Sequence, residues 1–105
     1  MQGNKKVVYL AGPITDVDRY WVQFEEAEDR LTAQGFAVLN PAKLPAGMTP
    51  EQYMRICFSM IGCADAVFFL TGWRDSKGAT LEWKYSQYVG KLCFYRETDV
   101  VEVLK

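Results

Sequence analysis

Short apolar runs rich in β-branched and aromatic residues recur along the chain, at residues 5–11, 36–40, 65–70 and 91–95. Each run has the length of a buried strand, and glycine, proline or polar residues separate it from its neighbours. The pattern therefore predicts four strands, each buried on both faces.

Helical patterns lie between these runs. Over residues 19–34 the apolar positions recur three and four residues apart, at Tyr20, Phe24, Ala27 and Leu31. Residues 49–62 begin with a capping box, in which Thr49 is the cap, Pro50 the first helical residue and Gln52 the partner. For a third helix at residues 78–89 we predict a core face of Leu81, Tyr85, Tyr88 and Val89. Residues 97–105 fit either a short helix or an edge strand.

The alternation of strands and helices predicts an α/β fold of flavodoxin-like or Rossmann-like type, a three-layer sandwich with a parallel sheet. Right-handed crossovers and short connections favour the strand order 2-1-3-4 in one domain spanning residues 1–105. In that order the switch point lies between the first and third strands, where ligands bind beyond the carboxyl ends. We therefore expect the loops at residues 12–18 and 71–78 to meet at a ligand site.

The first loop contains Gly12, Pro13, Ile14 and Thr15. A glycine allows a ligand to approach the backbone closely, and amides before a helix N-terminus favour anions. These four residues are candidates for substrate binding. The alternative is a tight turn with a helix cap and no ligand.

The second loop carries more of the candidate chemistry. Ser76 and Gly78 lie at the start of a helix, where a hydroxyl and free amides suit a phosphate or a sugar hydroxyl. Trp73 either stacks on a planar base or lies over a core edge. Asp75 either binds a sugar hydroxyl or caps the helix. Glu82 follows one turn later beside the crevice, and its alternative is a solvated surface position.

Composition narrows the function classes. The net charge is −1, from 12 basic and 13 acidic residues, which disfavours a protein that binds the backbone of a nucleic-acid polymer. Histidine is absent, which excludes Ser-His-Asp catalysis and histidine-ligated metals. The 3 cysteines form no CxxC pair and indicate reduced thiols in a cytoplasmic protein. The apolar run at residues 7–11 is too short for a signal peptide or a membrane span.

Three further positions have structural interpretations. Asp65 begins the third strand and therefore lies at the end of the sheet opposite the predicted site. Cys57 and Cys63, on or next to the second helix, are expected to be core thiols. The second helix is apolar nearly all round, which predicts packing on two sides and a subunit interface in a homo-oligomer.

Several motifs occur together in one order: Tyr9 to Ile14, Asn40-Pro41, Tyr53-Met54, Ala64 to Leu70 and Gly72 to Glu82. In combination they resemble the nucleoside 2-deoxyribosyltransferase superfamily, and most closely a short bacterial and phage branch of it, over roughly residues 5–95. The resemblance implies a flavodoxin-like fold and enzymes that cleave or exchange the N-glycosidic bond of 2-deoxynucleosides. One related branch hydrolyses deoxynucleoside monophosphates.

The resemblance also implies roles for individual residues. Glu82 corresponds to the family's nucleophile, and Ser76 to the phosphate-binding serine of the monophosphate branch. Tyr9 and residues 12–15 correspond to positions that contact the nucleotide. Cys57 stands where the family usually has an aspartate, eight residues before Asp65. A thiol does not replace a carboxylate as a proton relay.

The sequence thus predicts cleavage or transfer of the N-glycosidic bond of a 2-deoxynucleoside or its 5-monophosphate, through a glycosyl intermediate on Glu82. Asp75 or water would protonate the departing base, and the scheme needs no metal and no organic cofactor. The first alternative is a module that binds a nucleotide without turnover, which Cys57 favours. The second is a scaffold that acts through the apolar second helix. The resembling enzymes complete their sites with a neighbouring subunit, which again implies a homo-oligomer.

Overall fold

A single parallel sheet organises the protein. The computed structural model describes residues 4–105, and the three N-terminal residues ahead of the predicted first strand lie outside that part. Within it, β1 (Val7–Ala11), β2 (Ala37–Leu39), β3 (Ala66–Phe69) and β4 (Leu92–Phe94) form a 4-stranded sheet in the order β2-β1-β3-β4. All pairs are parallel. The predicted strand order is confirmed.

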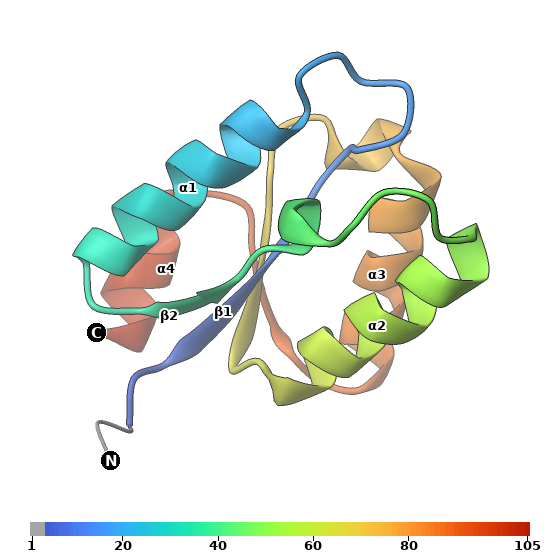
Figure 1. Cartoon of the computed structure of the whole chain (residues 1–105). Helices are drawn as coiled ribbons and strands as arrows, with labels where there is room; N and C mark the ends of the chain where they lie inside the picture. The colour runs from blue at the N-terminus through green and yellow to red at the C-terminus, as the bar shows by residue number, and fades with distance from the viewer. Residues whose placement is uncertain (1–3) are drawn as a thin grey trace.

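Helices cover both faces of the sheet. On one face lie α1 (Trp21–Ala33) and α4 (Glu97–Leu104), and on the other α2 (Pro50–Cys63) and α3 (Lys77–Tyr88) (Figure 1). The predicted three-layer α/β fold is therefore confirmed. The C-terminal segment is a helix because Val100, Val101 and Leu104 contact one core cluster at helical spacing.

Successive side chains of β1 point to opposite faces of the sheet and so join different core clusters. Val8 and Leu10 join the core under α1 and α4, whereas Tyr9 and Ala11 join the core under α2 and α3. All four are fully buried. The strand at the centre of the sheet thus directs a phenol, with its polar hydroxyl, into the layer between the sheet and the second helix pair.

The predicted core face of α3 is wrong at Leu81, Tyr88 and Val89, which are exposed, whereas Tyr85 packs against the core as predicted. Its buried residues are Ala79, Glu82 and Ser86, whereas Leu81 is 48% exposed and Tyr88 90% exposed. Small side chains at positions 79 and 86 allow the helix to lie close to the sheet. The hydrophobic pattern gave the wrong face because α3 buries the Glu82 carboxyl group, which accepts a hydrogen bond from Tyr9 in the sheet.

The apolar character of α2 has several local causes. Cys57 and Ile61 face the sheet, and Phe58 stacks on Tyr85 of α3 with ring centroids 4.4 Å apart. Of the two thiols expected in the core, Cys57 is buried, but Cys63 at the helix end is exposed. The role of this helix as a subunit interface stays a prediction.

Asp65 has the structural role expected for it. Its Oδ2 accepts a hydrogen bond of 2.7 Å from the backbone N–H of Val7. This contact closes the sheet at the amino ends of β1 and β3, opposite the predicted ligand site.

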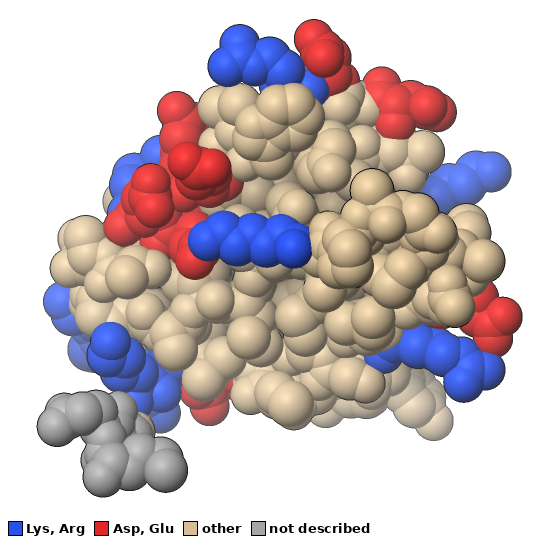
Figure 2. Space-filling view, viewed as in Figure 1, with Lys and Arg blue, Asp and Glu red and all other residues tan. Residues whose placement is uncertain are grey.

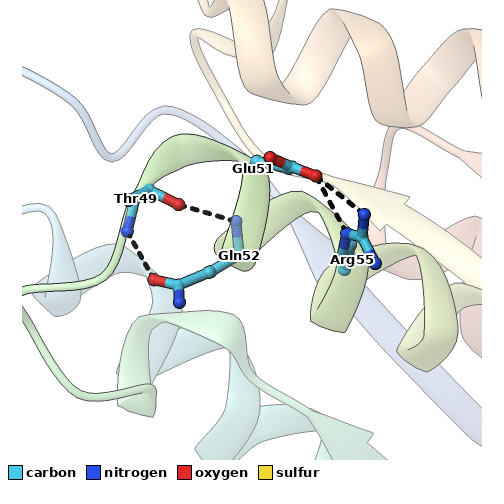
Figure 3. A network of polar contacts seen from close by, with 4 residues as sticks. All are labelled: Thr49, Glu51, Gln52 and Arg55. Carbon is cyan, nitrogen blue, oxygen red and sulfur yellow. Dashed lines mark hydrogen bonds and ion pairs between the residues drawn. The ribbon is translucent and has the colours of Figure 1, made fainter.

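The start of α2 contains the predicted capping box (Figure 3). Thr49 Oγ1 accepts from the N–H of Gln52 at 3.1 Å, and Gln52 Oε1 accepts from the N–H of Thr49 at 2.9 Å. One turn further on, Arg55 forms an ion pair with Glu51 at 2.8 Å. The two reciprocal bonds satisfy amides that a helix N-terminus otherwise leaves unpaired.

Thr49→Ala is expected to lower the free energy of unfolding by about 1 kcal/mol, because it removes the side-chain acceptor of the cap. Urea denaturation measures the change. Thr32→Ala is the matched control, since Thr32 is exposed within α1 and alanine favours the helix interior. An equal loss in both variants would contradict the role of the cap.

Candidate functional site

The two loops predicted to meet do lie together beyond the carboxyl ends of β1 and β3. The N–H of Leu70 donates to the carbonyl of Ala11 at 2.7 Å, which extends the pairing of the two strands to their ends. Further out, a Cβ added at Gly72 would lie 3.2 Å from Cγ of Pro13. Pro13 therefore joins the two loops to each other and does not line the space between them.

A cleft of about 790 Å³ opens at this place. Four segments form its walls: the loop after β1, the loop after β2, the first half of α2 and the start of α3. Most of the residues predicted from the sequence lie on it, namely Gly12, Ile14, Thr15, Asp75, Ser76, Gly78 and Glu82. The topological switch point and these candidate residues therefore coincide in space.

Glu82 is the buried acid of this cleft. Its side chain belongs to α3, is 5% exposed, and accepts a hydrogen bond of 2.8 Å from the Tyr9 hydroxyl through Oε2. The alternative of a solvated surface position for Glu82 is therefore wrong. Tyr9 is fully buried and lies behind the carboxyl group, so its hydroxyl holds Glu82 and does not line the cleft.

Burial raises the pKa values of three neighbouring groups, the side chains of Glu82, Cys57 and Tyr9. Desolvation raises the pKa of Glu82 to about 7, while the contacts with the Tyr9 hydroxyl and the Cys57 thiol act in the opposite direction. Desolvation also raises the pKa of Cys57 to about 11 and that of Tyr9 well above its ordinary value. Near neutral pH the carboxyl group is therefore divided between its protonated and ionised forms, and the thiol is neutral.

Ser76, and not Asp75, caps the N-terminus of α3. Ser76 is the cap of α3, and its Oγ accepts from the N–H of Ala79 at 3.2 Å. The cap alternative for Asp75 is therefore wrong, and its exposed carboxylate lines the cleft. Because a hydroxyl group is both donor and acceptor, the Ser76 proton remains available to an acceptor atom of a ligand.

Trp73 does not reach the cleft. Its ring packs against Phe69 with centroids 4.9 Å apart and stacks with Tyr95 at 5.7 Å and Trp83 at 6.0 Å. Its alternative, a position over a core edge, is what the structure shows. The ring is part of the core cluster between the sheet and α3, which makes it unavailable for stacking on a base in the cleft.

The sequence by itself did not assign to the site the aromatic residues that line the cleft, although Tyr53 belongs to one of the motifs that carry the resemblance. They are Tyr20, just before α1, and Tyr53, in the first turn of α2. Nor did it indicate the loop after β2, although Pro41 and Ala42 lie on the cleft. A signal was present, since Asn40-Pro41 ends β2 at the same edge of the sheet as the two predicted loops.

Comparison with known proteins adds a family and a fold. A family model described as a domain of unknown function, DUF4406, matches residues 6–95. The chain belongs to this family. No curated protein matches the sequence. None of the helices described between residues 4 and 105 has the length and apolar character required to cross a membrane.

A solved structure resembles this DUF4406 chain in fold. It is a 2-desoxiribosyltransferase from Leishmania mexicana, with a TM-score of 0.68 and 18% sequence identity. The likeness covers 84% of the present chain and 61% of the enzyme, so the chain spans about three fifths of that enzyme's length. The deoxyribosyltransferase-like fold expected from the sequence motifs is thereby confirmed.

The raised pKa of Glu82 predicts a pH-dependent stability. The folded-state pKa of about 7 lies above the ordinary value of 4.5, so the folded protein holds the Glu82 proton more tightly than the unfolded chain does. The stability that this proton contributes is fully present below pH 4.5 and is lost as the pH rises through 7. Between pH 5 and pH 8 this amounts to about 2–3 kcal/mol of unfolding free energy. Glu82→Gln cannot ionise and is expected to gain that amount relative to the wild type over this range.

Urea denaturation of both proteins at pH 5 and pH 8 checks this expectation. Glu26→Gln, which changes an exposed carboxylate on α1, is the matched control and should follow the wild type. A constant difference between Glu82→Gln and the wild type at the two pH values would show that Glu82 ionises normally.

Proposed function

We propose that this protein cleaves or transfers the N-glycosidic bond of a 2-deoxynucleoside or of its 5-monophosphate. The observation that carries the proposal is the buried Glu82 carboxyl group, held by the Tyr9 hydroxyl on the wall of a cleft of about 790 Å³. A cleft of this size is typical of sites for small organic ligands. The fold shared with the Leishmania mexicana 2-desoxiribosyltransferase supports the same reaction class.

In the first step a Glu82 oxygen attacks the anomeric carbon of the deoxyribosyl group. The bond from that carbon to the base breaks, and the base leaves with the electron pair and takes up a proton from Asp75 or from water. In the second step a water molecule or a second base attacks the same carbon and releases Glu82. Two displacements through a carboxylate nucleophile are the chemistry of retaining glycosidases.

The environment of Glu82 suits a nucleophile that works near neutral pH. Burial removes the water that would shield the carboxylate, and the pKa of about 7 leaves a substantial ionised fraction in solution. The Tyr9 hydroxyl donates to Oε2, which fixes the group and leaves Oε1 for the reacting carbon. In this proposal Tyr9 is a positioning residue.

The remaining cleft residues support recognition of a nucleoside or nucleotide. The backbone of residues 12–15 borders the space beyond β1, and the start of α3 brings the Ser76 hydroxyl and the Gly78 backbone to the opposite wall. The positive end of the helix dipole at Ser76 favours an anionic group, which supports a 5-monophosphate. Asp75 would bind a sugar hydroxyl or protonate the base.

Cys57 favours one alternative, a module that binds a nucleotide without turnover. The thiol lines the cleft beside Glu82, and its pKa of about 11 makes it neutral and a weak acid near pH 7. The cluster around Glu82 therefore lacks a second carboxylate. In the alternative, the same cleft holds the ligand and Glu82 contributes affinity only.

A chromatographic assay for free base tests the proposal. The protein is incubated with each 2-deoxynucleoside and each 5-monophosphate, with and without a second base. We expect base release that falls on the order of a thousandfold in Glu82→Gln, because the amide is not a nucleophile. Glu26→Gln should keep the wild-type rate.

The outcomes separate the candidate functions. Release that requires a second base indicates a transferase, and release in water alone indicates a hydrolase. No release, together with a rise in melting temperature on adding a nucleotide, would support the binding module. Neither release nor stabilisation by any of these compounds would contradict both.

Tyr9→Phe tests the role of the buried hydrogen bond. Because the Tyr9 hydroxyl lowers the pKa of Glu82, its removal should raise that pKa further. In the wild type kcat/KM should rise with pH to a plateau above about pH 7. In the variant the midpoint should move upward on the order of one pH unit, and Tyr88→Phe, at a surface position, should leave it unchanged.

A further inference from the structure

One wall of the cleft is an irregular segment, residues 44–48, which joins the short 3-10 helix at Pro41–Lys43 to the start of α2. Leu44 and Met48 line the cleft, while Ala46 and Gly47 between them are exposed. Figure 1 shows this connection as an extended loop that runs past the sheet edge to α2. The cleft is therefore bounded on this side by a single stretch of chain.

A single hydrogen bond holds the middle of this segment. Both ends are anchored, since the N–H of Leu44 donates to the carbonyl of Pro41 at 3.1 Å and the capping box fixes Thr49. Between these anchors, within the described residues 4–105, the one polar contact is that of the Tyr53 hydroxyl, which donates to the carbonyl of Pro45 at 2.5 Å. The N–H groups of residues 46–48 have no protein acceptor there. Few contacts and solvated amides are the marks of a segment that opens locally.

Tyr53 belongs to the cleft as well as to this contact. Its ring lines the cleft from the first turn of α2, on a helix held by its own capping box. A ligand that fills the cleft therefore touches the side chain that holds the segment closed. The occupant of the cleft and the position of residues 44–48 are therefore coupled through Tyr53, in addition to the direct contact that Leu44 and Met48 make with the cleft.

The segment presents apolar side chains to whatever lies beneath it. Between Lys43 and Glu51 it carries no charged residue, and Lys43 is paired with Glu28 at 2.9 Å. Figure 2 shows that the face carrying this loop and α2 is largely uncharged, with one basic side chain across its middle and the other charged side chains toward its margins. Closure over a planar ligand would thus bury Leu44 and Met48 against it, and the segment itself brings no charge out of water.

We propose that residues 44–48 are a strap that opens to admit the ligand and closes over it, and that Tyr53 is its latch. The nature of the ligand rests on the proposed function, whereas the latch does not. Loss of a single net hydrogen bond changes an opening equilibrium roughly 3- to 10-fold. That factor is the expected size of the effect of removing the Tyr53 hydroxyl.

Limited proteolysis of Tyr53→Phe, with a protease that cleaves beside large apolar residues such as Leu44 and Met48, tests the latch without any ligand. The variant keeps the ring and loses the donor, so cleavage within residues 44–48 should become roughly 3- to 10-fold faster, because cleavage follows the population of the open form. Tyr88→Phe is the control. Unchanged cleavage within residues 44–48, or equal acceleration of cleavage throughout the chain, would overturn the latch.

Substitution of Gly47 gives a second, independent test of the strap, with Gly35 as the matched control. Gly47 has φ +96° and Gly35, at the end of α1, has φ +95°, and neither has an atom within 4 Å of an added Cβ. Alanine at either position strains the backbone to a similar degree. Only Gly47→Ala should accelerate proteolytic cleavage within residues 44–48. If Gly35→Ala accelerated this cleavage equally, the effect would be global and the strap would be excluded.

Kinetics with the 2-deoxynucleosides and their 5-monophosphates test the closure. If the strap holds the bound ligand, Tyr53→Phe should raise KM roughly 3- to 10-fold and keep kcat within about twofold, since the strap contributes to binding and not to bond cleavage. A fall in kcat with unchanged KM would overturn the strap. If the wild type neither turns over nor binds any of these compounds, the proposed function fails, and limited proteolysis still decides the latch.

Discussion

The candidate site depends on one buried hydrogen bond at the base of the cleft, from the Tyr9 hydroxyl to the Glu82 carboxyl group. A carboxyl group that is 5% exposed is costly unless a partner satisfies it. The central strand supplies that partner, because alternation along β1 turns Tyr9 toward α2 and α3. The small residues Ala79 and Ser86 bring α3 near enough for the bond to form. The same burial that requires the partner raises the pKa of Glu82 into the range where a carboxyl group acts near neutral pH.

The cleft around this bond is formed on one side by regular elements and on the other by the irregular loop after β2. Strand ends, the capped start of α3 and the capped start of α2 hold Glu82, Ser76 and Tyr53 on regular elements. The loop after β2 closes the remaining side with few polar contacts of its own. A site built this way fixes its reacting group and leaves one wall free to adjust to a ligand. Cys57 completes the buried cluster as a neutral thiol, so that Glu82 has no second negative charge beside it.

The strands, their order and the meeting of two loops were predictable because each depends on local patterns and a few general rules of chain connection. The capping box of α2 was predictable for the same reason, since its partners lie three residues apart. The predicted face of α3 was wrong except at Tyr85, because hydrophobic periodicity counts Glu82 as a surface residue and Leu81 as a core residue. Trp73 was left between two interpretations, because only the packing of Phe69, Tyr95 and Trp83 determines where its ring lies.

The sequence by itself determined the fold, the end of the sheet at which the site lies, and seven of the residues that line it. These follow from periodicity, turn residues and the handedness of crossovers, which act over short stretches of chain. Tertiary structure alone decided that Glu82 is buried, that Tyr9 holds it from behind, and that Tyr53 closes the loop after β2. The first two depend on contacts between residues far apart in the chain, 73 positions apart for Tyr9 and Glu82. Tyr53 and Pro45 are only 8 positions apart, but the path of an irregular loop decides whether they meet. Desolvation of a carboxyl group depends on all the atoms that surround it. The raised pKa of Glu82 is therefore set only when the helices pack on the sheet.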